Sequence, residues 1–90
     1  MNEGKLRLEV ERGNKAEQLL KNPIFVEVFD LLEKRYVEEL INTKSSEHEK
    51  RERCYNAIRA LGHVEQHIRS VSETGVMAAQ QINEMLKPKY

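Results

Sequence analysis

The chain has 90 residues, of which 33% are charged and 39% hydrophobic, and its 15 basic residues are balanced by 15 acidic ones. This length allows one small domain, and the lack of tryptophan with only 4 glycines and 2 prolines favours a helical bundle over a β-sandwich or a disordered tail. Because proteins that bind nucleic acid typically carry a basic excess, the even charge argues against DNA as a partner.

Residues 1–13 are a predicted arm whose structure the sequence leaves open. Leu6, Leu8 and Val10 alternate with charged residues, which is a strand pattern, but the chain offers no second strand to pair with. The arm can add to a strand of another chain, continue as a helix, or stay loose. No apolar run has the length of a signal peptide or a membrane span, so we expect a soluble, intracellular protein without membrane contact.

Residues 14–90 are the predicted helical domain. Asn14, directly after Gly13 and three residues before Glu17, predicts a helix start and a short helix over about 15–21. Asn22 and Pro23 predict the next start, because Asn caps helices and Pro suits the first helical position. The second helix, about 23–42, has a broad apolar face, and its expected hairpin core is Phe25, Phe29, Leu32, Tyr36 and Leu40.

The third predicted helix covers about residues 47–86. It opens with a capping box, Ser46 followed three residues later by Glu49. Its narrow stripe of apolar or small residues has alternating spacings of four and three, namely Ala57, Leu61, Val64, Ile68, Val71, Gly75, Ala78, Ile82 and Met85. We interpret Gly75 as a place where another helix approaches closely, not as a break. Cys54, the single cysteine, is expected to be buried beside the stripe.

The helix lengths predict an all-α fold built on an antiparallel helical hairpin, because the short loop after residue 42 can only reverse the chain. Two helices leave apolar surface uncovered. We therefore expect homo-oligomerisation, to a dimer or higher, to close a helical bundle. The oligomer seam would be the stripe from Leu61 onward: Leu61, Val64, Ile68, Val71, Gly75, Ala78, Ile82 and Met85.

No catalytic signature is present, so we expect neither an enzyme nor a cofactor. His63 and His67 have the spacing of two metal ligands on one helix face, but no further His or Cys completes a site, and no metal is expected. Side chains that flank the stripe would line any cleft between protomers. These candidates for ligand or partner contacts are Arg59, His63, Arg69 and Thr74.

One resemblance covers residues 11–79. It rests on three segments, ERGNKAEQLLKNPIFVEVFDLLEKRYVEELINT, then Arg51-Glu52-Arg53, then NAIRALGHVEQHIRSVSETGVMAA. Together they resemble a group of small, all-helical proteins of tailed bacteriophages, often encoded near head-assembly genes. The resemblance assigns no functional residue. It implies a protein located in the host cytoplasm or in the virion.

Two classes of function follow as expectations. The resemblance favours a non-enzymatic helical interaction protein that acts in virion or head assembly through its helical faces. The alternative is a phage anti-defence protein that sequesters a host protein or a small nucleotide signal between protomers. Deep pockets lined by Arg, His or Tyr would favour sequestration, whereas flat apolar patches would favour assembly.

Overall fold

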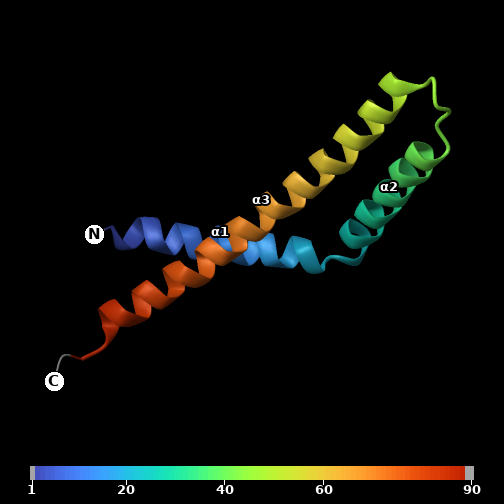
Figure 1. Cartoon of the computed structure of the whole chain (residues 1–90). Helices are drawn as coiled ribbons and strands as arrows, with labels where there is room; N and C mark the ends of the chain where they lie inside the picture. Colours follow the sequence, from blue (N-terminus) through green and yellow to red (C-terminus); the bar gives the residue numbers. More distant parts are fainter. Residues whose placement is uncertain (1, 89–90) are drawn as a thin grey trace. The chain divides into compact units, whose positions relative to one another are not determined.

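The computed structural model describes residues 2–88, so Met1 of the predicted arm and Lys89 and Tyr90 of the predicted helical domain lie outside the described residues. The described chain consists of α1 (Glu3–Lys21), α2 (Pro23–Ile41) and α3 (His48–Leu86), drawn in Figure 1. It contains no strand within residues 2–88, which confirms the all-α prediction. The bounds of α2 and α3 agree with the sequence to within one residue.

α1 corrects the prediction for the N-terminal segment. The helix runs without interruption through Gly13 and Asn14, so the predicted helix start at Asn14 is wrong. Of the three structures considered for the arm, the structure shows the helix. The alternating pattern does not reflect a strand. In a strand, Leu6 and Leu8 would lie on the same face and be similarly buried. Leu6 is buried at 8% exposure, whereas Leu8 is 55% exposed.

The junction between α1 and α2 follows the local chemistry of Asn22 and Pro23. The Asn22 side chain accepts hydrogen bonds from the backbone N–H groups of Ile24 and Phe25, at 2.9 and 3.2 Å. Pro23 occupies the first helical turn, where its missing N–H leaves no partner unsatisfied. This N-cap is confirmed.

The start of α3 differs from the predicted capping box. The helix begins at His48. Its first backbone hydrogen bond is donated by the Arg51 N–H to the carbonyl oxygen of Glu47, at 3.1 Å. Glu47 therefore stands at the N-cap position given to Ser46. Its carboxylate is also engaged in the loop, where it accepts from the Lys44 N–H at 2.8 Å. Arg51 braces the same loop by donating to the carbonyl oxygens of Lys44 and Ser45, at 2.6 and 3.2 Å.

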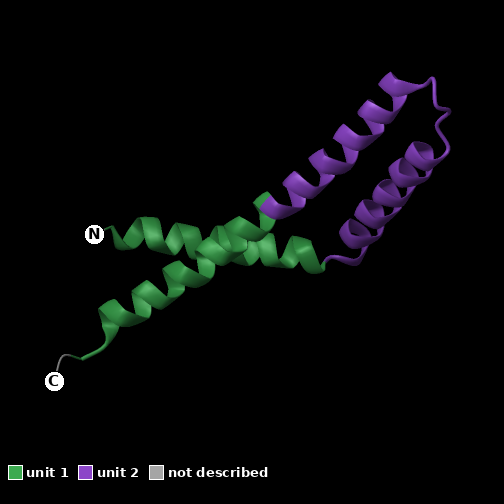
Figure 2. Ribbon diagram, viewed as in Figure 1, with its two compact units in different colours: residues 1–21, 67–90 green, residues 22–66 purple. Residues whose placement is uncertain are grey.

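The chain divides into two compact units, coloured in Figure 2. Unit 1 pairs α1 with the second part of α3 and comprises residues 1–21 and 67–90, of which 1, 89 and 90 are not described. Unit 2, residues 22–66, pairs α2 with the first part of α3. The predicted hairpin is therefore unit 2, and the predicted single domain of residues 14–90 separates into two helix pairs. One continuous helix of 39 residues, about 58 Å long, contributes to both.

Neither unit encloses a large core. Among residues 2–88 the buried apolar residues are Leu6, Cys54 and Ala78, and no large side chain is less than 2% exposed. Two helices can cover only one side of each other, so every further apolar position lies at least partly in solvent. The expected burial of Cys54 is confirmed, at 4% exposure.

Candidate protein-interaction surface

Two positions in the second half of the predicted oligomer seam are covered by the chain's own α1. Gly75 is buried, and Ala78 is only 2% exposed. Both belong to unit 1, where α1 is the neighbouring helix. The assignment of these two positions to a contact between protomers is therefore corrected, because an intrachain helix already occupies their side of α3.

Gly13 and Gly75 form the point of closest approach between α1 and α3. A Cβ atom built on Gly13 would lie 2.7 Å from the Cα of Gly75 and 3.2 Å from the Val71 carbonyl oxygen. One built on Gly75 would lie 2.8 Å from the Cα of Gly13. Distances below 3.0 Å between such atoms require the backbones to move apart, so only glycine fits at either position. The interpretation of Gly75 as a close approach within an unbroken helix is confirmed.

Other seam positions are less covered than the pattern predicts. Leu61, Ile68, Val71 and Ile82 are half-buried, whereas Val64 and Met85 are 49% and 45% exposed. The reason at Val64 is rotational. The covered side of α3 in unit 2 is centred near Cys54, Ile58 and Leu61. Val64 follows Cys54 by ten residues, and ten steps of ~100° leave it rotated by about 80° from Cys54 around the helix axis.

The five residues predicted as the hairpin core lie on one side of α2 and are all half-buried: Phe25, Phe29, Leu32, Tyr36 and Leu40. The rings of Phe25 and Phe29 contact each other with centroids 4.5 Å apart. Near the loop end, Cys54 Sγ lies 3.9 Å from Glu39 Oε2. This contact places residues 39 and 54 at about the same level of the two antiparallel helices.

A second apolar row on α2 has no covering element within unit 2. Ile24, Val28 and Leu31, spaced by four and three, are 64%, 44% and 58% exposed. On α3, Val64 and Ala60 are exposed as well. We call these five residues the open face of unit 2.

Two residues of the α2 row, Val28 and Leu31, lie beside the α3 part of the open face. Counting from the contact between Glu39 and Cys54, Val28 is level with residue 65 and Leu31 with residue 62, so Val64 and Ala60 lie beside them. Both rows are displaced from the contact line by a similar rotation in the same sense. In an antiparallel pair, equal rotations bring side chains to the same side. The sequence indicates this surface only through the broad apolar face of the second helix.

The predicted ligand contacts are divided between the two units. Arg59 and His63 belong to unit 2 and are exposed, and Arg59 Nη1 donates to the Tyr55 hydroxyl at 3.2 Å. This bond to Tyr55 raises the pKa of Arg59. Arg69 and Thr74 belong to unit 1 and are also exposed.

Two hollows in unit 1 are lined by both of its helices. One, of about 220 Å³, lies beside the glycine crossing. The other, of about 270 Å³, contains Thr74 and is lined by Glu9, Arg12, His67, Ser70, Val71 and Thr74. Both are smaller than the ~300–1,000 Å³ typical of ligand pockets. Larger hollows on α2 and α3 are each lined by a single helix, as convex surfaces are.

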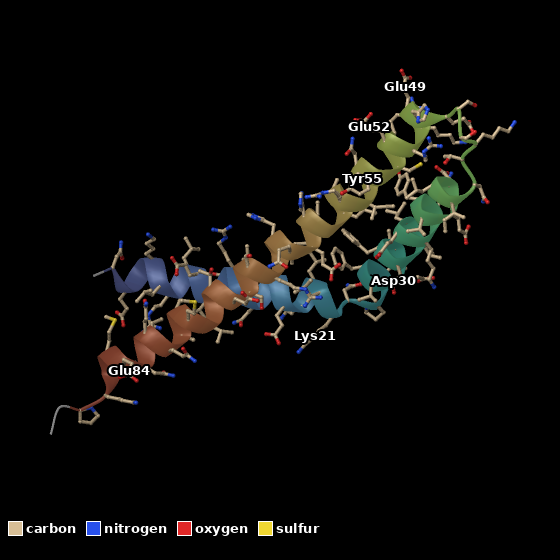
Figure 3. All side chains as sticks on the ribbon, viewed as in Figure 1. Lys21, Asp30, Glu49, Glu52, Tyr55 and Glu84 are labelled. Carbon is tan, nitrogen blue, oxygen red and sulfur yellow. The ribbon has the colours of Figure 1, made fainter. Side chains whose placement is uncertain are left out.

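Charged side chains surround these apolar surfaces. Glu49 and Glu52 project from the side of α3 that faces away from α2 (Figure 3).

Within residues 2–88, no group of three or more His, Cys, Asp or Glu side chains is arranged to hold a metal ion. No helix in this described part is both long and apolar enough to cross a membrane.

No protein-family model, curated protein or solved structure matches the chain. The resemblance to small phage proteins therefore stays a prediction from the quoted sequence segments.

Proposed function

We propose that this chain is a non-enzymatic helical interaction protein that acts in virion or head assembly of a tailed phage, in the host cytoplasm, by binding protein partners through its helical faces. The observation that carries the proposal is the open face of unit 2. Ile24, Leu31 and Val64 expose about half or more of their surface on one side of a helix pair. Contiguous exposed apolar patches on soluble proteins are typical of protein-binding sites.

The surrounding chemistry supports binding of a protein rather than a small molecule. The hollows formed by two helices are small, and the candidate ligand contacts are divided between the units. An exposed apolar surface with charged residues at its edge has the composition of a protein interface, in which an apolar centre is surrounded by a polar rim.

Co-expression tests this function. The chain is produced together with each protein encoded beside its own gene, and complexes are purified and their stoichiometry measured. We expect a defined complex with one of these proteins. A Val28→Glu/Leu31→Glu variant should lose it, because a carboxylate cannot be buried there without a partner. Failure of every neighbouring protein to form a complex would contradict a role in assembly.

The alternative, sequestration of a small nucleotide signal, is favoured by one observation only. The hollow beside Thr74 brings Arg12 and His67 to the same place, and these are side chains that bind phosphate. If this site binds nucleotides, a saturating nucleotide should raise the unfolding temperature through linkage, and Arg12→Ala should abolish the rise. An assembly protein should show no such rise.

A further inference from the structure

We draw no further inference here: the strongest candidate, the exposed apolar surface patch that α2 and α3 form on the open face of unit 2, carries nothing beyond the proposed function because nothing in the structure shows what covers it.

Discussion

Gly13 of α1 lies directly against Gly75 of α3, so closely that a Cβ atom on Gly13 would be 2.7 Å from the Gly75 Cα. Each glycine costs about 1 kcal/mol of helix propensity relative to alanine. Both positions are nevertheless buried inside regular helices. The close contact that they permit therefore explains why unit 1 holds together although its only other buried described residues are Leu6 and Ala78.

Alanine at the crossing should destabilise unit 1. We expect Gly13→Ala and Gly75→Ala each to lower the free energy of unfolding by about 1–3 kcal/mol, because the added methyl group forces the two backbones apart. Amide hydrogen exchange, followed residue by residue, assigns the loss to α1 and the second part of α3.

Gly62 is the matched control. It lies in the same helix as Gly75, but a Cβ there meets nothing within 4 Å. Gly62→Ala should therefore stabilise the protein by up to about 1 kcal/mol through propensity alone. The glycine crossing would be refuted if Gly13→Ala were as stabilising as Gly62→Ala.

Removal of the α2 N-cap should destabilise unit 2. Asn22→Ala deletes the acceptor of two backbone N–H groups, and we expect a loss of about 1 kcal/mol in urea unfolding. Asn22→Ser keeps an acceptor oxygen and should retain most of that stability. Equal losses in both variants would show that the side-chain oxygen is not what stabilises the helix start.

The thiol of Cys54 should be protected from reagents in the native protein. It is 4% exposed, so reaction with a disulfide reagent requires local opening. An opening cost of about 3 kcal/mol corresponds to a rate more than roughly 100-fold below that of the unfolded chain. A Cys54→Ala/Lys34→Cys variant, whose thiol would replace an exposed side chain, should react at the unfolded rate. Rapid labelling of native Cys54 would contradict the packing of unit 2.

The ion pair of Glu17 and Lys21 predicts a pH dependence in α1. Lys21 Nζ donates to Glu17 Oε1 at 2.8 Å, and this bond lowers the pKa of Glu17 below its ordinary 4.5. The ionised carboxylate therefore stabilises the helix above that pH, and the stabilisation is lost as the pH falls through the lowered pKa. A side-chain NMR titration should show the low pKa and its return to the ordinary value in Lys21→Met. An unchanged pKa in that variant would contradict the pair.

Local chemistry made much of the fold predictable. Asn22 and Pro23 specify a helix start through groups next to each other in sequence, and the spacing along α3 specifies a continuous helix. Gly75 was also informative, since a glycine on an apolar stripe indicates a neighbouring backbone. The capping box at Ser46 is also a local signal, but it placed the N-cap one residue too early. The N-cap of α3 is Glu47, whose carbonyl accepts from the Arg51 N–H.

The partner of each helix face was not predictable in the same way. A glycine such as Gly13 can mark the end of a helix or a place where two helices cross closely. Only the contact with Gly75, which is 62 positions away in the sequence, shows that Gly13 lies at a crossing. A helical spacing of seven residues links Leu6, Gly13 and Leu20, and it could have placed Gly13 on a covered face. The open face was missed as a surface because its two rows, on α2 and α3, become adjacent only after the hairpin forms.

The native mass of the unmodified chain, measured by light scattering after size-exclusion chromatography, tests the expectation that further copies of this chain cover the apolar surface left exposed by its helices. We expect a mass of two or more times 10.6 kDa at micromolar concentrations, with a shift toward a single chain on dilution. A mass of one chain at every concentration, with the helices intact by circular dichroism, would contradict it.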